Sequence, residues 1–233
     1  MDSSDPNLRH ELAMRMAELA RSTAAPSTLK QILDGVTAAT VELIPGADLA
    51  GVLLVKKGGE FESLAETDSL VAKLDRLQHD FGEGPCAQAA LQHTIVRSDD
   101  LRSESRWPQY APAAVELGVL SGLSFKLYTA DRTAGALNVF SRRADAWDTD
   151  AETTGAILAA HAATAILAQR QEEQLQSALL TRDRIGQAKG IIMQSYDVDD
   201  VQAFDMLRRI SQESQTKLAD IAQRVIDTRG QGK

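Results

Sequence analysis

Cysteine is almost absent from this chain of 233 residues, and its scarcity excludes several kinds of protein. The single cysteine, Cys86, can form neither an internal disulfide nor a multi-cysteine zinc site. The histidines are few and lack metal-binding spacing, so we expect no metal; they are His10, His79, His93 and His161. No serine–histidine–aspartate set or carboxylate pair has an informative spacing, so we expect no enzyme.

Long apolar runs are also missing. No window reaches the roughly 18 uninterrupted apolar residues that a membrane helix needs. Charged residues, including Asp2, Asp5 and Arg9, occupy the N-terminus in place of a signal-peptide core. We therefore expect a cytoplasmic protein with no membrane partner. Hydrophobic residues make up 43% and charged residues 25%, which suits a folded protein of one large or two small domains.

Charge divides the chain into two parts. The net charge is −8, which argues against a generic nucleic-acid binder. Residues 1–175 carry 16 Lys and Arg against 25 Asp and Glu, a balance of −9, whereas residues 176–233 carry 9 against 8, a balance of +1. Within that tail, residues 195–206 contain four aspartates and no base. Such sorting fits either solvated helix faces or a local binding surface.

Strand pairs alternate with helices in the first 150 residues. Helical spacing predicts helices over residues 7–21 and from Pro26 to Pro45. Residues 49–55 and 60–65 read as a hairpin around a turn at 56–59. Residues 119–127 and 134–140 alternate with a two-residue period and form a second hairpin around 129–132, and a short helix is expected near 87–91. This pattern predicts an α+β fold with an antiparallel sheet and flanking helices.

Strand signals vanish after Asp150. Residues 151–194 contain no proline and predict one long helix or two joined helices, with a patchy heptad that suggests self-association. Asp199 with Gln202 forms a capping box for the next helix. We expect that helix to bury Ala203, Phe204, Leu207 and Ile210, and we expect a third helix to bury Leu218, Ile221, Ala222 and Val225. Tyr196 is expected to be a half-buried hinge residue rather than a base-stacking one.

Two glycines flank Lys189 inside the long helix. At 100° per residue, Arg182, Gly186 and Lys189 fall on one stripe. Each helical glycine costs about 1 kcal/mol relative to alanine, so Gly186 and Gly190 indicate that something approaches the backbone closely. That partner is either another helix or a ligand.

The tail resembles the ANTAR domain of bacterial antitermination regulators. Residues 184–193 read RIGQAKGIIM, residues 203–212 read AFxxLRxxSQ, and residues 217–222 read KLxxIA. One departure is Gln215, where the pattern has Asn. The resemblance implies a three-helix domain over residues 176–230 that binds paired RNA stem-loops as a dimer, so that transcription continues past a terminator.

The residues expected to contact RNA follow from matching this chain to those motifs. Lys and Arg hold phosphates, amides bond to bases, and small residues admit a base. The set is Arg184, Gln187, Ala188, Lys189, Gly190, Arg208, Ser211, Gln212, Gln215 and Lys217.

The first part resembles the GAF domains that precede ANTAR domains in actinobacteria. The matching segments are GEGPC at 82–86, RWP at 106–108, GVLS at 118–121 and GALN at 135–138. The resemblance covers residues 26–168, after an N-terminal helix at 1–25, and a helical linker at 150–185 joins it to the ANTAR part. A GAF domain implies a sensor for a small molecule of unknown identity. We expect Cys86, Trp107 and Ser121 in its ligand pocket, and no block typical of cyclic-nucleotide binders is present.

Two alternatives stay open at this point. A DNA-binding regulator would place one of the last helices in a major groove. A thiol or redox sensor would depend on Cys86, whose position near a helix start favours the thiolate. A lone cysteine is more often a small buried residue, and Trp107 is more often a core residue than a ligand clamp. The sequence favours a GAF sensor that adjusts RNA binding by an ANTAR domain.

Overall fold

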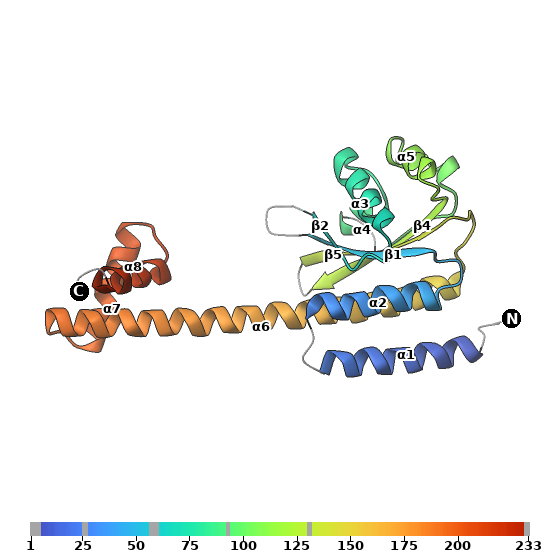
Figure 1. The fold of residues 1–233 in the computed structure, drawn as a ribbon. Coiled ribbons are helices and arrows are strands. Elements are labelled where there is room, and N and C mark those ends of the chain that lie inside the picture. Colours follow the sequence, from blue (N-terminus) through green and yellow to red (C-terminus); the bar gives the residue numbers. More distant parts are fainter. Residues whose placement is uncertain (1–5, 25–27, 56–60, 92–93, 130–131, 231–233) are drawn as a thin grey trace. The chain divides into compact units, whose positions relative to one another are not determined.

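The computed structural model describes residues 6–24, 28–55, 61–91, 94–129 and 132–230, which belong to two compact units (Figure 1). The first unit covers Met1–Gln169 and the second covers Arg170–Lys233. One helix, α6 (Thr149–Tyr196), supplies residues to both. The expected α+β sheet with flanking helices, followed by a helical tail, is confirmed.

A five-stranded antiparallel sheet forms the centre of the first unit, in the order β2-β1-β5-β4-β3. Both expected hairpins are present, as β1 with β2 and β4 with β5. The 56–59 turn and residues 130–131 lie outside the described residues. The strands are β1 (Leu49–Val55), β2 (Phe61–Leu64), β3 (Ile95–Ser98), β4 (Ser121–Thr129) and β5 (Arg132–Ser141).

Helices cover both faces of this sheet. The helices α1 (Pro6–Ala24) and α2 (Leu29–Leu43) and the first part of α6 lie on one face, and α3 (Ser69–Phe81), α4 (Pro85–Leu91) and α5 (Tyr110–Glu116) lie on the other (Figure 1). Because side chains alternate along a strand, Val52 and Leu54 of β1 pack on the α2 and α6 side, whereas Leu49 packs on the α3 side. The sheet therefore separates two hydrophobic cores.

Local signals explain the ends of α2. Thr28 and Gln31 form a capping box at its start, and Pro45 follows its end. The expected beginning at Pro26 lies outside the described residues.

Several elements between the hairpins escaped prediction, whereas one helix, α4, was expected near residues 87–91. The helix α3 (Ser69–Phe81) begins at the N-cap Asp68, whose side chain accepts from Leu70 N. The helix α4 (Pro85–Leu91) begins two residues before the expected start. The elements η1 (Leu101–Ser103) and α5 (Tyr110–Glu116), like the four-residue strand β3, are too short for a clear periodicity.

The second unit is a three-helix bundle of the end of α6, α7 (Asp200–Glu213) and α8 (Leu218–Gly230). The expected capping box of Asp199 and Gln202 begins α7. Its buried core consists of Ala188, Ile192, Ala203, Leu207, Ile221 and Ala222. Of the two expected alternatives, residues 151–194 form one continuous helix, as part of α6. The third helix, α8, begins at Leu218.

Three side chains of this unit are more exposed than the sequence predicted. Phe204 and Ile210 were expected in the core, but they are 37% and 43% exposed because α7 turns its Ala203 and Leu207 side inward. Tyr196 was expected to be half-buried and is 66% exposed at the end of α6. The buried core of the bundle accordingly combines three alanines with Ile192, Leu207 and Ile221.

By length and composition alone, α6 is apolar enough to cross a membrane, and it is the one such helix among the described residues. Of its most apolar 18-residue window, 44% is buried inside the protein. This feature is weak evidence for a membrane span.

Candidate nucleic-acid interface and sensor site

Lys189 and the small residues around it form a stripe along α6. Lys189, Gly190 and Met193 lie three, four and seven residues after Gly186, which places all four on one face of the helix. A Cβ atom added at Gly186 or Gly190 would meet nothing within 4 Å. The close partner that these glycines suggested is therefore not found among the described residues, and the stripe is open at both positions.

The Lys189 ammonium is already paired. Its Nζ lies 2.5 Å from Oδ1 of Asp200, the first residue of α7. The Lys189 side chain is 22% exposed, whereas that of Asp200 is 66% exposed. The lysine stem therefore lies against the bundle, and the charged end reaches the surface beside the α6–α7 turn.

Three predicted contacts on α6 do not share this face. Ala188 is fully buried in the bundle core, so its expected role as a small RNA-contacting surface is wrong. Arg184 and Gln187 are exposed, but residues five and two positions from Lys189 do not face the same way on a helix. One RNA segment resting on Lys189 would therefore not reach them on the same chain.

The outer face of α7 carries a mixture of charged, amide and apolar side chains. Asp200, Phe204, Arg208 and Gln212 follow at four-residue intervals, so they share one exposed face. The Arg208 guanidinium lies 3.3 Å from the Asp205 carboxylate in an exposed pair. Sequence reasoning assigned Phe204 to the core, although its place one residue after the small Ala203 is a signal for a different helix face.

The α7–α8 turn holds two of the predicted contacts, Ser211 and Gln215, in structural roles. The Ser211 hydroxyl donates to the Thr216 carbonyl at 2.6 Å, and Thr216 N donates back to the Ser211 carbonyl at 3.1 Å. Gln215 has a φ of 51°, in the left-handed region that favours Gly and Asn. The asparagine of the ANTAR pattern suits this backbone conformation, and the glutamine here occupies it at some strain. Lys217 is exposed immediately before α8.

The predicted RNA contacts thus fall into two groups along α7. Lys189 lies beside the first residue of α7, whereas Ser211, Gln212, Gln215 and Lys217 lie at its end. Twelve residues of helix separate Asp200 from Gln212, which is about 18 Å at 1.5 Å per residue. Arg208 lies between the two groups.

The three residues expected in the ligand pocket have separate surroundings. Cys86 is buried against Leu53 and Ala136. Trp107 belongs to the core on the α3 side, as its alternative assignment predicted, and its ring meets Tyr110 edge to face. The buried Ser121 hydroxyl donates to the Arg143 carbonyl at 2.7 Å. These contacts link none of the three residues to another.

The Cys86 thiol has the wrong environment for reactivity. It is 1% exposed, and burial, reinforced by the charge of Asp75, raises the pKa of Cys86. A reactive thiolate needs the opposite shift and access to solvent. The thiol-sensor alternative therefore has no support from the surroundings of Cys86.

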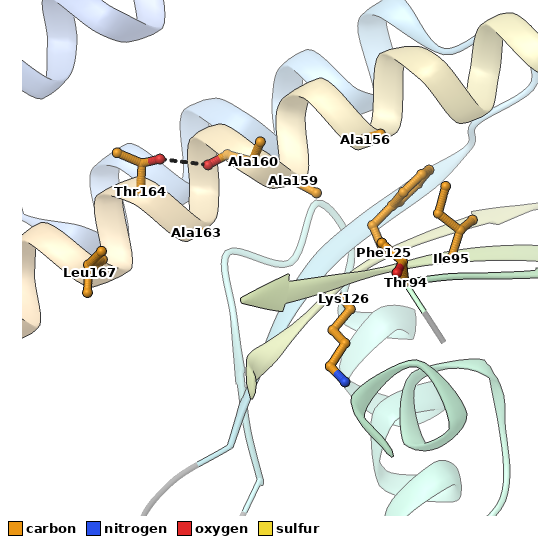
Figure 2. A pocket seen from close by; sticks show the side chains of 10 residues that line it. All are labelled: Thr94, Ile95, Phe125, Lys126, Ala156, Ala159, Ala160, Ala163, Thr164 and Leu167. Atoms are coloured by element: carbon orange, nitrogen blue, oxygen red, sulfur yellow. Dashed lines mark hydrogen bonds between the residues drawn. The ribbon is translucent and has the colours of Figure 1, made fainter. Parts of the chain in front are cut away.

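A groove of about 350 Å³ lies between α6 and the β3–β4 edge of the sheet (Figure 2). Alanines of α6 line one wall, and Phe125 and Ile95 rise toward them from the strands. Lys126 extends away from α6. The lining residues are Thr94, Ile95, Phe125, Lys126, Ala156, Ala159, Ala160, Ala163, Thr164 and Leu167, and none of the predicted pocket residues is among them.

A polar network is buried on the other side of the sheet. The Asp75 carboxylate accepts hydrogen bonds from the Ser63 hydroxyl at 2.6 Å and from the Asn138 amide at 3.1 Å. Asn138 in turn accepts from the Ser124 hydroxyl at 2.7 Å. Burial raises the pKa of Asp75 to about 6, although both donors oppose the shift. Sequence reasoning quoted Asn138 only as part of a motif and missed Asp75.

Family comparisons agree with the division into two units. Residues 26–167 match the model of the GAF domain, a sensory domain class. Residues 173–226 match the model of the ANTAR domain. The chain therefore belongs to the GAF family, with the architecture of a GAF–ANTAR regulator, and it combines a sensory domain with a regulatory domain of transcription.

Solved structures support the fold of the first unit. The GAF domain of a phosphoenolpyruvate-protein phosphotransferase from Coxiella burnetii is 18% identical with a TM-score of 0.58, covering 70% of this chain and 96% of that chain. A free methionine-R-sulfoxide reductase from Neisseria meningitidis, in complex with its substrate, is 19% identical with a TM-score of 0.52. The match covers 74% of this chain and 96% of that chain. These identities show the fold alone. The comparison with curated proteins found no match.

Proposed function

We propose that this protein is a cytoplasmic antitermination regulator, in which the GAF domain adjusts the binding of paired RNA stem-loops by the ANTAR domain. The observation that carries the proposal is the ANTAR match over residues 173–226. The open stripe at Gly186, Lys189 and Gly190 supports it, because small residues beside a cation admit a base while the cation holds a phosphate.

The RNA surface that we propose differs from the one expected from sequence. It comprises the Lys189 stripe and the outer face of α7, with Phe204 and Arg208, and it extends to Gln212 and Lys217. An exposed aromatic ring such as Phe204 offers a surface on which an unpaired base stacks. We leave out Ala188, which is buried, and assign Ser211 and Gln215 to the turn.

Self-association through α6 is the second part of the proposal. Residues 171–180 are all exposed, although Leu175, Leu179 and Leu180 are large and apolar. A helix with such side chains gains stability when a second copy covers them. A parallel homodimer would bring two ANTAR domains to the two loops of one RNA.

The sensor would act by changing the balance between two arrangements of the linker. A ligand does so only through its difference in affinity for them, and a tenfold change in output requires about 1.4 kcal/mol. The ligand's chemistry stays open. A reductase activity is not proposed, because the one thiol is buried and no second cysteine is present to resolve it.

The test is RNA binding by the full chain, measured by fluorescence anisotropy with a labelled two-loop RNA. Replacing Lys189 or Arg208 by alanine should weaken binding without lowering the melting temperature. Lys73→Ala, an equal charge change on α3 of the GAF domain, is the matched control. About four phosphate contacts on single-stranded loops predict a log–log salt slope of roughly −3. Equal effects of all three substitutions would contradict the proposed surface.

A further inference from the structure

The ion pair between Lys189 and Asp200 connects two helices within the proposed RNA surface, where the α6 stripe meets the start of α7. The two charged atoms are 2.5 Å apart, and the pair joins residues eleven positions apart across the α6–α7 turn. The lysine is the more buried partner, at 22% exposed against 66% for the aspartate. An anion approaching Lys189 from solvent therefore meets the Asp200 carboxylate first.

Asp200 is not needed to begin α7. The capping box is made by the preceding residue, Asp199, whose carboxylate accepts from Gln202 N at 2.8 Å. The Gln202 side chain completes the box by accepting from Asp199 N at 3.1 Å. The carboxylate of Asp200 is thus free of any capping task and can leave Lys189 without opening the helix.

A phosphate and the Asp200 carboxylate compete for the same ammonium. Both are anionic acceptors, and little of the Lys189 side chain is exposed, so there is no room for both at full strength. Because the Asp200 partner is 66% exposed, the pair contributes little stability, and a well-placed phosphate can displace the carboxylate. A polyanion that places no phosphate beside Lys189 gains less from displacing the Asp200 carboxylate.

We propose that Asp200 is an internal competitor that keeps Lys189 neutralised until a phosphate of bound RNA displaces it. The role rests on the proposed function. It makes the cation available to a ligand that fits and screens it from polyanions that do not.

The experiment compares Asp200→Asn with Asp220→Asn in the full chain. Asp220 is the matched control, because it is also an exposed acid in the first turn of a helix in the same unit. Removing the competitor should tighten binding of the two-loop RNA about two- to fivefold beyond the effect of Asp220→Asn. Weaker binding would mean that Asp200 instead positions Lys189, and a result equal to the control would reduce its role to general charge; either overturns the proposal.

A second arm shows that the effect passes through Lys189. In a Lys189→Met background, Asp200→Asn should change RNA binding no more than Asp220→Asn does. A persisting advantage would overturn the proposal.

Retention on a heparin column separates this proposal from the RNA assignment. Heparin is a polyanion without a defined fold, and Asp200→Asn should elute at higher salt than Asp220→Asn as long as Lys189 is present. If that difference appears while no variant binds the stem-loop RNA, the proposed function fails, but the competition of Asp200 with external anions for Lys189 is supported. If the heparin difference is absent, the competition fails even when RNA binds.

Discussion

The buried carboxyl of Asp75 should make the stability of the GAF domain fall as the pH rises from 4 to 7. Its folded pKa of about 6 lies above the usual 3.8, so the unfolded chain releases this proton more readily than the folded one. The stabilising contribution is complete below pH 3.8 and is lost as the pH passes through 6. A shift of about two units corresponds to about 3 kcal/mol, and roughly 1–1.5 kcal/mol of the loss falls between pH 5 and 7.

Urea unfolding of the full chain measures this effect. Both tryptophans, Trp107 and Trp147, are buried in the first unit, so their fluorescence reports on the GAF domain alone. Asp75→Asn removes the titration, and its free energy of unfolding relative to the unsubstituted protein should rise by that amount from pH 5 to 7. Asp80→Asn, at an exposed position on the same helix, should show no such trend. Equal pH dependence in the unsubstituted protein and Asp75→Asn would refute the reasoning.

Four further substitutions test the packing and the assembly. Gln215→Gly should stabilise the second unit by about 0.5–1 kcal/mol by relieving the left-handed backbone, seen as slower hydrogen exchange in α7 and α8; faster exchange would contradict it. Gly155→Ala should lower GAF stability by about 1–3 kcal/mol in urea unfolding, because its Cβ would lie 2.2 Å from the Phe125 ring. Gly186→Ala, on the same helix in open space, should instead be neutral or stabilising by up to about 1 kcal/mol. Leu175→Glu should convert a dimer to a monomer, measured as a halved mass in light scattering. An unchanged mass would exclude a dimer contact through Leu175.

Local chemistry was sufficient to predict much of this architecture. The two-residue period located β4 and β5, a short apolar run located β1, and the Asp199 and Gln202 pair located the start of α7. These features depend on residues close together in sequence. The N-cap residue Asp68, followed by the apolar Val71 and Leu74, is a comparable local signal for the start of α3.

The candidate site was less predictable because it depends on packing between helices. Alanine is as compatible with a surface as with a core, and only the approach of α7 and α8 decides that Ala188 is buried. The same packing turns Phe204 outward and brings Asp200 to Lys189. Composition recorded four aspartates near the turn, but not which cation each one neutralises.

The central claim is that the tail binds RNA stem-loops in preference to duplex DNA. Displacement of a labelled two-loop RNA from the full chain by unlabelled competitors, at one stated salt concentration, tests it most directly. We predict that the same RNA unlabelled displaces the probe at a concentration at least tenfold lower than duplex DNA of equal length. Equal displacement by duplex DNA would contradict the RNA assignment and favour a DNA-binding regulator.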